Sequence, residues 1–203
     1  MKKVLIATTN YGKYQVYNAI FSELGIETCN LNDLDLSAKI EENGANELEN
    51  AVIKAKAYHE LTGLPVLSND SGLIINKFAS KDQPKELVRR YNGKELTDQE
   101  LLNVYIEKLT NVGGKSKGHF VVALALIDEN GKLHTKLFNP KRYFINKPSL
   151  VMVSGIPLSS LAYDKHTKKY MSEMTAEEMN TYEGKAMKAQ KKFIQKVFKK
   201  TGN

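Results

Sequence analysis

The 203-residue chain is 41% hydrophobic and 26% charged, and its formal net charge is +7. This composition excludes collagen-like, coiled-coil and disordered chains, and the length suffices to bury the core of one globular domain or of two closely packed lobes. The charge excess lies in residues 185–200, which contain seven lysines and no acidic residue, whereas the remaining basic and acidic residues balance at 23 each. We expect a single domain over residues 1–203.

The cysteine content and the lengths of the apolar runs indicate the cellular compartment in which the protein is expected. Cys29 is the only cysteine of the sequence, which excludes an intrachain disulfide and a multi-cysteine zinc site. A reducing cytoplasm is therefore the expected location. The N-terminal apolar run spans only residues 4–7, which is too short for a signal peptide. No run approaches the roughly 18 apolar residues of a membrane span, so we expect no membrane partner.

The chain opens with a predicted strand, turn and helix. Residues 4–8 are a short apolar run typical of a buried strand, and the polar turn 9–13 follows. A second strand is expected at 27–31. The helix between them is predicted from apolar residues at helical spacing, which are Val16, Ala19, Ile20 and Leu24.

A second helix and a third strand come next. Asn46 and Glu49 have the three-residue spacing of a capping box, which predicts a helix to about Leu61. Residues 65–67 lead into a short strand that ends at the polar residues 69–72, and the chain continues apolar beyond them. Polar residues therefore interrupt an otherwise buried segment.

The middle of the chain contains one further helix. Residues 78–96 are expected to be irregular to helical. Thr97 and Glu100 form a capping box for a helix to about Leu109, and a glycine-bearing loop is predicted at 113–118.

An antiparallel hairpin follows this loop. Residues 120–127 are a strongly apolar strand, Asn130-Gly131 is a hairpin turn signal, and residues 133–144 pair back. A capping box at Thr175 begins the final helix, and an interruption near Gly184 is left open. Alternating strands and helices with one hairpin predict an α/β fold with a mixed sheet.

The first candidate for chemistry is the turn 8–13. A helix N-terminus there offers free backbone amides and a positive dipole end beside a lysine and hydroxyl groups, which together suit a phosphate. Ala7 and Tyr14 exclude a P-loop, which requires glycine and a hydroxyl residue at those positions. An ordinary turn with a solvated lysine is the alternative.

A second candidate is the acidic loop ahead of the second helix. Glu41 and Glu42 precede Gly44, and the helix carries Asn50 and Lys54 four residues apart on one face. Adjacent carboxylates can bind Mg²⁺, which prefers one or two carboxylates together with phosphate oxygens and water. A solvated acidic loop is the alternative.

A third candidate is the polar cluster 69–72, which contains Asp70. Catalytic groups of α/β proteins commonly lie at strand ends, although an Asx turn has the same sequence pattern.

Taken together, the three clusters resemble the inosine triphosphate pyrophosphatase family. The stretches are ATTNYGK at 7–13, EENGANELENAVIKAKA at 41–57 and LSNDSGL at 67–73. The family patterns at these places are close to ATxNxxK, EETGxTFxxNAxxKA and ADDSGL. The resemblance is strong over the first third of the chain and looser at 120–127 and 169–179.

The resemblance implies an elongated, two-lobed α/β fold, with a twisted mixed β-sheet flanked by helices, that usually forms a homodimer. It also implies hydrolysis of a nucleoside triphosphate to the monophosphate and pyrophosphate, with Mg²⁺ or Mn²⁺ as cofactor. Carried over by position, Glu41 and Asp70 would bind the metal, Asp70 would also be the general base, and Lys54 would complete the catalytic group. The substrate-binding residues implied in the same way are Thr8, Thr9, Asn10, Lys13, Asn50, Ser71, Gly72 and Lys185.

The sequence also departs from the family pattern. Asn69 stands where the first aspartate of the paired motif is expected, which removes one negative charge beside the metal. The family's base-recognition stretch aligns with residues 155–160, where Ser159 replaces an aspartate. A family lysine falls on Met179, and its Ser-His-Arg motif falls on residues 183–185. The motifs implied to bind phosphate and metal are therefore kept, whereas those implied to recognise the base are changed.

Three hypotheses follow. The first is a metal-dependent pyrophosphatase with altered base specificity, acting on a non-canonical, modified or pyrimidine nucleotide. The second is a nucleotide-binding or sequestering protein with weakened catalysis, in line with Asn69 and Met179. The third, nucleic-acid binding by residues 185–200, is disfavoured because apolar residues recur there at the spacing of an amphipathic helix with solvated lysines. These are Ala186, Ala189 or Gln190, Phe193, Ile194 and Val197.

Overall fold

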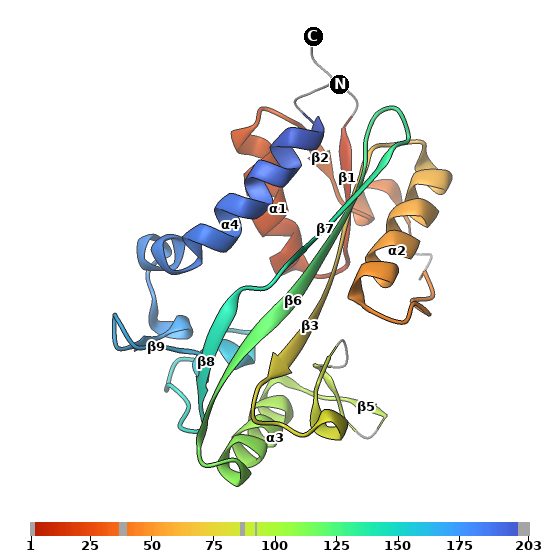
Figure 1. Ribbon diagram of the computed structural model, residues 1–203. Coiled ribbons are helices and arrows are strands. Elements are labelled where there is room, and N and C mark those ends of the chain that lie inside the picture. The colour runs from red at the N-terminus through yellow and green to blue at the C-terminus, as the bar shows by residue number, and fades with distance from the viewer. Residues whose placement is uncertain (1–2, 37–39, 86–87, 92, 199–203) are drawn as a thin grey trace. The chain divides into compact units, whose positions relative to one another are not determined.

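A mixed sheet is the centre of the fold (Figure 1). The computed structural model describes residues 3–36, 40–85, 88–91 and 93–198, and six strands of this part form the sheet in the order β2-β1-β3-β6-β7, with β8 also paired to β6. β1 pairs in parallel with β2 and β3, whereas β6 pairs antiparallel with β7 and β8. The predicted α/β class with a mixed sheet is confirmed. The strands are β1 (Val4–Ala7), β2 (Thr28–Cys29), β3 (Val66–Ile75), β6 (Lys115–Ile127), β7 (Leu133–Phe138) and β8 (Lys141–Ile145).

The chain divides into two compact units. The first has the bounds Met1–Ser71, Val122–Phe138 and Lys188–Asn203, and the second has the bounds Gly72–Val121 and Asn139–Met187. The strands β3 and β6 and the last helix contribute residues to both units.

Helices cover both faces of the sheet in the first unit (Figure 1). On one face, α2 (Glu47–Thr62) packs Ala51, Ala55 and Tyr58 into a core with residues of β1, β3 and β6. Small alanine side chains allow the helix backbone to approach the strands closely. On the other face lie α1 (Tyr11–Glu23) and the last part of α4 (Ala176–Phe198), where the rings of Phe21 and Phe198 meet edge to face at 5.3 Å.

The buried face of α1 differs from the predicted one. Ile20 is buried as expected, but Val16 and Ala19 are exposed, and Tyr17 and Phe21 take their place. Aromatic rings bury more apolar area than valine or alanine, which favours the rotation of the helix that buries the rings.

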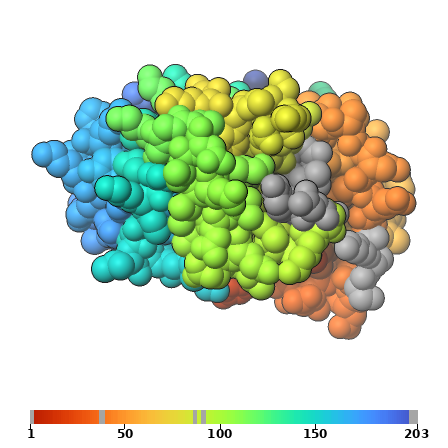
Figure 2. Space-filling model, turned by 90° about the horizontal axis from the view of Figure 1, so that it is seen from below, coloured from red at the N-terminus to blue at the C-terminus, as the bar shows by residue number. Residues whose placement is uncertain are grey.

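In the second unit, α3 (Asp98–Asn111) begins at the predicted capping box. The side chain of Thr97 accepts the N–H of Glu100, and the Glu100 carboxylate accepts the N–H of Thr97. Figure 2 looks onto the outer face of this helix, whose exposed residues are polar. Its inner face packs Leu101, Leu102, Tyr105 and Leu109 against Leu73, Ile75, Phe144 and Leu161.

Short elements complete the two units. The first unit contains η1 (Asn32–Leu34). The second contains η2 (Ser80–Asp82), β4 (Arg90–Tyr91), β5 (Lys94–Glu95), η3 (Pro157–Ser160), β9 (Tyr163–Asp164), β10 (Lys169–Tyr170) and η4 (Met171–Glu173). The segment predicted as irregular to helical therefore holds a 3₁₀ turn and a small hairpin.

Two loops predicted from glycines and polar residues are strands. β3 runs without interruption through residues 69–72, and β6 begins at Lys115, within the predicted loop. Gly118 explains the second case, because a Cβ at this position would lie 2.5 Å from the carbonyl oxygen of Ile74. This glycine therefore serves close strand approach and not a turn.

The last helix is continuous from Ala176 to Phe198, so Gly184 does not interrupt it. Gln190, Ile194 and Val197 are buried as the spacing predicts, and Phe198 joins them. No helix among the described residues has the length and apolar character needed to cross a bilayer.

Candidate functional site

Strand register brings two of the sequence clusters together in the first unit. In the parallel pair of β1 and β3, Ala7 lies opposite Ser68. The chain turns after Ala7, where the Thr8 N–H bonds the Ile6 carbonyl, whereas β3 continues from Ser68 through Asn69 and Asp70. Buried apolar residues precede each polar segment, so the sheet core itself aligns the two clusters.

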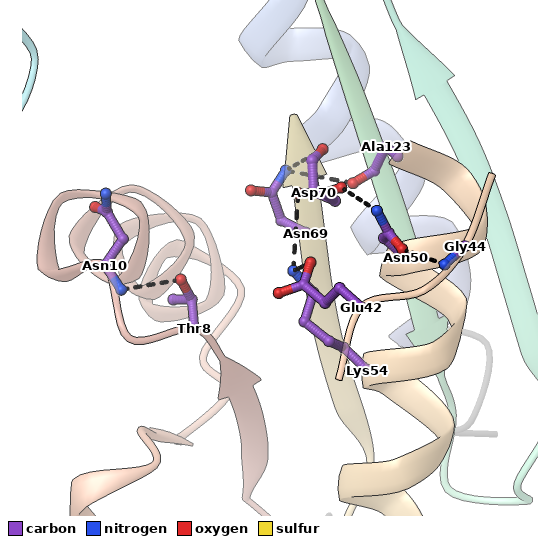
Figure 3. A network of polar contacts seen from close by, with 9 residues as sticks. All are labelled: Thr8, Asn10, Glu42, Gly44, Asn50, Lys54, Asn69, Asp70 and Ala123. Atoms are coloured by element: carbon purple, nitrogen blue, oxygen red, sulfur yellow. Dashed lines mark hydrogen bonds and ion pairs between the residues drawn. The ribbon is translucent and has the colours of Figure 1, made fainter. Parts of the chain in front are cut away.

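The turn after β1 caps the first helix. The Asn10 side chain accepts the backbone N–H of Lys13 at 3.0 Å, and the Thr8 hydroxyl accepts the N–H of Asn10 at 3.2 Å. Thr9 and Asn10 are exposed. The turn thus presents hydroxyl groups at a helix N-terminus, the favourable end of the dipole for an anion (Figure 3).

Gly44 fixes the start of the second helix. Its N–H donates to Oδ1 of Asn50 at 2.8 Å, and a Cβ at residue 44 would lie 2.7 Å from that same oxygen and from Cβ of Glu49. No larger residue fits there without moving the helix. The predicted cap is present, since the Asn46 side chain accepts the N–H of Glu49 at 3.0 Å.

Asp70 is oriented from α2. The Nδ2 of Asn50 donates to its Oδ2 at 3.4 Å, and the Nζ of Lys54 lies 3.8 Å from its Oδ1 (Figure 3). The side chains of Lys54 and Asp70 are each only 14% exposed. Burial raises the pKa of the Asp70 carboxyl, and this outweighs the opposing charges of Lys54 and Lys13. A raised pKa makes this carboxylate a stronger base than an ordinary aspartate, as a group that accepts a proton from water requires.

In the acidic loop, Glu42 is the residue whose carboxylate contacts Lys54. The Oε2 of Glu42 lies 2.8 Å from the Nζ of Lys54. Glu41 is exposed, and its carboxylate has no ion pair among the described residues. Successive side chains of an extended segment point in opposite directions, so only one of two adjacent glutamates can face Lys54. The sequence pattern does not choose between the two glutamates of the acidic loop, and the family resemblance implied Glu41 as the metal ligand.

Lys13 completes this group of charges. Burial, with the like charge of Lys54, lowers the pKa of Lys13 from 10.5 to about 8, against the opposite influence of Asp70 and Glu42. We call Lys13, Glu42, Lys54 and Asp70 the matched cluster, because two cations face two carboxylates. It collects residues from three separate sequence motifs.

Asn69 is held by the sheet. Its Nδ2 donates to the carbonyl oxygens of Ala123 and Asp70, each at 3.3 Å (Figure 3). Its Oδ1 is buried and has no hydrogen-bond partner in the part of the chain that the structure describes, and the same holds for the hydroxyl of Ser68. Buried polar atoms without partners are rare in folded proteins and often mark where a ligand or water binds.

The remaining predicted residues have different surroundings. The backbone N–H of Ser71 bonds the Asp70 carboxylate, which stabilises its charged form. Gly72 is buried, and the Ser71 side chain is partly exposed. Lys185 is exposed on α4, within the bounds of the second unit.

Two residues that align with the family's base-recognition stretch and its Ser-His-Arg motif, Ser159 and Glu183, make contacts within the second unit. The Ser159 hydroxyl donates to the carbonyl of Ile156 at 2.7 Å. Glu183 forms an ion pair with the buried guanidinium of Arg142, which also lies 5.6 Å and 5.4 Å from the ring centroids of Phe120 and Tyr182. A cavity of about 440 Å³ in this unit is lined by Arg142 and by tyrosines 143, 163 and 182, among others.

Comparison with models of known protein families gives a match over most of the chain. Residues 4–140 match the family model described as the Ham1 family. The chain belongs to the Ham1 family. This confirms the resemblance to inosine triphosphate pyrophosphatases that its three motifs carry.

Relatives of this Ham1 family chain have named activities. The protein of Halalkalibacterium halodurans called dITP/XTP pyrophosphatase is 32% identical over 181 residues, which cover 89% of this chain and 91% of that protein. A Leptospira interrogans protein of the same name is 34% identical over 129 residues, and the match spans 64% of either chain. The chain therefore covers slightly less than two thirds of the Leptospira protein.

Solved structures share the fold. The HAM1 protein from Coxiella burnetii matches with a TM-score of 0.76 at 24% identity, covering 97% of this chain and all of that one. The Staphylococcus aureus Ham1 protein matches with a TM-score of 0.75 at 20% identity, covering 96% and 98%. The expected fold class is thereby confirmed.

The donor set of the matched cluster is compatible with a hard divalent cation. Among the described residues, no three histidine, cysteine, aspartate or glutamate side chains gather as a complete metal site. Mg²⁺ does not require one, because it commonly uses one or two carboxylates and completes its shell with phosphate oxygens and water. Asp70 and Glu42, which share Lys54 as a cation, provide two such carboxylates.

Proposed function

We propose that this chain hydrolyses a nucleoside triphosphate or deoxynucleoside triphosphate to the monophosphate and pyrophosphate. The single observation that supports this most is Asp70, a carboxyl with raised pKa that Asn50 orients beside two lysines. The names of the Halalkalibacterium and Leptospira relatives agree with this activity.

The matched cluster has the groups that such a reaction needs. Lys13 and Lys54 neutralise the phosphates, and the turn Thr8–Asn10 binds phosphate oxygens at the helix N-terminus. Asp70 takes a proton from a water molecule that attacks the α-phosphorus, and the backbone N–H of Ser71 keeps the carboxylate in place. Positive charge close to the phosphates stabilises the charge that develops in the transition state.

We further propose Mg²⁺ or Mn²⁺ as the cofactor. Asp70 would hold it with Glu41, as the family pattern implies, or with Glu42, whose carboxylate lies 2.8 Å from the Nζ of Lys54. When bound, a divalent ion neutralises phosphate charge and orients the phosphate oxygens. Substitution of Glu41 and Glu42 separately by glutamine distinguishes the two, because only the ligand's loss should raise the metal concentration needed for half-maximal activity.

The base preference is proposed to differ from that for inosine or xanthosine. Ser159 and Glu183 stand at positions of the family's base-recognition motifs, and both are engaged in contacts with their own unit. Lys185 remains exposed and available to a ligand. The substrate is therefore proposed to be a non-canonical, modified or pyrimidine nucleotide.

A second candidate is a nucleotide-binding or sequestering protein with weakened catalysis. The observation in its favour is Asn69, whose amide bonds the Ala123 carbonyl where the family pattern has a carboxylate. Calorimetry that finds tight nucleotide binding without turnover would favour this candidate.

A homodimer and a cytoplasmic location are also proposed, from the family resemblance and the single buried cysteine. Sedimentation of the purified chain tests the dimer.

The test of the main proposal is pyrophosphate release across a panel of canonical and modified triphosphates with Mg²⁺. Release from at least one nucleotide is expected. No release from any triphosphate by a folded protein would reject hydrolysis and leave the binding candidate.

A further inference from the structure

A second lysine-rich region lies in the first unit and shares no residue with the matched cluster. A cavity of about 560 Å³ is lined by residues of β7, of the turn before it and of the last part of α4, which lies beside β7 in Figure 1. We call it the basic cavity. Its lining residues are Lys132, His134, Lys136, Lys192, Phe193, Lys196 and Val197.

Local geometry explains why these side chains converge. Lys132, His134 and Lys136 alternate along an extended segment and therefore share one face of it. Lys192 and Lys196 are four residues apart on α4 and share one face of the helix. Two sequence segments thus contribute two lysines each.

The charges of the basic cavity are unmatched. None of its four lysines forms an ion pair with a carboxylate among the described residues, in contrast to Lys191 of the same helix, which pairs with Glu23. The nearby Asp128 is already occupied, because one oxygen lies 2.8 Å from Nε2 of His134 and the other accepts the N–H groups of Asn130 and Lys132. Like charges around one cavity repel each other, and a multivalent anion would relieve this.

The aromatic residue in the lining is not available to a base. The Phe193 ring packs against Phe138 with centroids 6.2 Å apart, and the Nζ of Lys136 lies 5.8 Å from its centroid. Binding of a nucleobase or of single-stranded nucleic acid usually employs an open aromatic face. The cavity therefore offers positive charge without a stacking surface, in a volume of small-molecule size.

We propose that the basic cavity binds a compact polyphosphate, recognised by charge alone. Free pyrophosphate, longer inorganic polyphosphate and the triphosphate end of a nucleotide share this chemistry. The matched cluster differs because its carboxylates repel phosphate unless a metal ion lies between them. The lining of the basic cavity has no carboxylate, so it can bind phosphate without a metal ion. This binding is independent of the proposed hydrolysis.

The test is calorimetric titration of inorganic tripolyphosphate into the full chain, with a chelator present. All proteins carry Lys13→Ala, which weakens phosphate binding at the matched cluster. Adding Lys192→Gln with Lys196→Gln should weaken the remaining binding roughly tenfold or more, because two of the four positive charges that attract the anion are removed. The remaining binding should also fall as salt is raised.

The matched control is Lys56→Gln with Lys188→Gln, which removes the same charge from exposed positions outside the cavity. The control should bind as before, and circular dichroism should find all variants folded. Equal loss in the control, no loss in the cavity variant, or no binding by the parent protein would overturn the proposal. The proposal would also be overturned if a short single-stranded DNA or a nucleoside triphosphate bound more tightly than tripolyphosphate and this tighter binding were lost in the cavity variant, since that result requires contacts in the cavity beyond phosphate charge.

Discussion

The two lysine-rich regions of the first unit differ in how their charges are balanced. In the matched cluster, Lys13 and Lys54 are partly buried and face two carboxylates. In the basic cavity, four exposed lysines have no carboxylate partner among the described residues. Burying a charge is costly unless it is paired, so the buried lysines need partners and the exposed ones do not. The number of lysines therefore says little about function, whereas the arrangement of carboxylates around them distinguishes the proposed reacting site from the proposed anion-binding site.

The largest effect should come from Asp70→Asn, which keeps the size of the side chain and removes its basicity. The proposed hydrolysis should fall roughly a hundredfold or more, since general-base catalysis typically contributes that much. Steady-state pyrophosphate release measures it. Asn50→Ala is the companion variant: it leaves the carboxylate in place, removes a donor that orients it, and should cost less. Equal activity of Asp70→Asn and wild type would remove Asp70 from the mechanism.

The next effect tests whether close packing positions the matched cluster. In Gly44→Ala the added Cβ meets Asn50 and Glu49 at 2.7 Å, so the start of α2 must shift. We expect a loss of about 1–3 kcal/mol in the free energy of unfolding, the usual cost of overpacking. Chemical denaturation measures this loss of stability. Gly63→Ala is not a suitable control, because Gly63 has a positive φ that alanine adopts only under strain. Gly184→Ala is the matched control, since open space surrounds its Cβ position. An unchanged Gly44→Ala protein would contradict the proposed packing.

A pH effect of intermediate size is expected from Lys13. Its charge is lost above about pH 8, so the KM for the triphosphate should rise above that pH by roughly tenfold. In Lys13→Arg the rise should disappear, because the guanidinium stays charged. A KM with the same pH profile in both proteins would show that another group titrates.

The same shift predicts how stability changes with pH. The pKa of Lys13 is about 8 in the fold and 10.5 in its ordinary state, so the unfolded chain binds more protons between these values. The contribution of Lys13 to the free energy of unfolding should therefore increase with pH across this window. Denaturation at several pH values checks the sign, with Lys13→Met as the variant that lacks the effect.

The smallest effect should come from the basic cavity. Lys192→Gln with Lys196→Gln should leave pyrophosphate release within about twofold of wild type, as expected for surface substitutions away from the reacting groups. A large fall would mean that the cavity takes part in the reaction, and the two regions could no longer be treated as separate.

Local signals predicted much of the fold. The caps at Asn46 and Thr97 and the hairpin turn at Asn130-Gly131 lie where the sequence indicates. The course of β3 through residues 69–72 could not be predicted in this way, because partners far along the chain hold it: Asn69 bonds Ala123, and Leu73 exchanges backbone hydrogen bonds with Lys85. Strand formation depends strongly on such neighbours.

The candidate site was predictable in its motifs but not in its details. Lys54 and Asp70 meet as the family pattern implies. The choice of Glu42 as the partner of Lys54 depends on the direction of a loop, which sequence does not set. The basic cavity is a harder case, because residues 132–136 and 192–196 belong to segments with no shared motif and meet only through packing of α4 beside β7.

The central claim is that a water molecule activated by Asp70 attacks the α-phosphorus of a nucleoside triphosphate. Hydrolysis in water labelled with heavy oxygen, followed by mass spectrometry of both products, tests it most directly. We expect the label in the nucleoside monophosphate and none in the pyrophosphate. Label in the pyrophosphate, or release of inorganic phosphate that carries it, would contradict the claim.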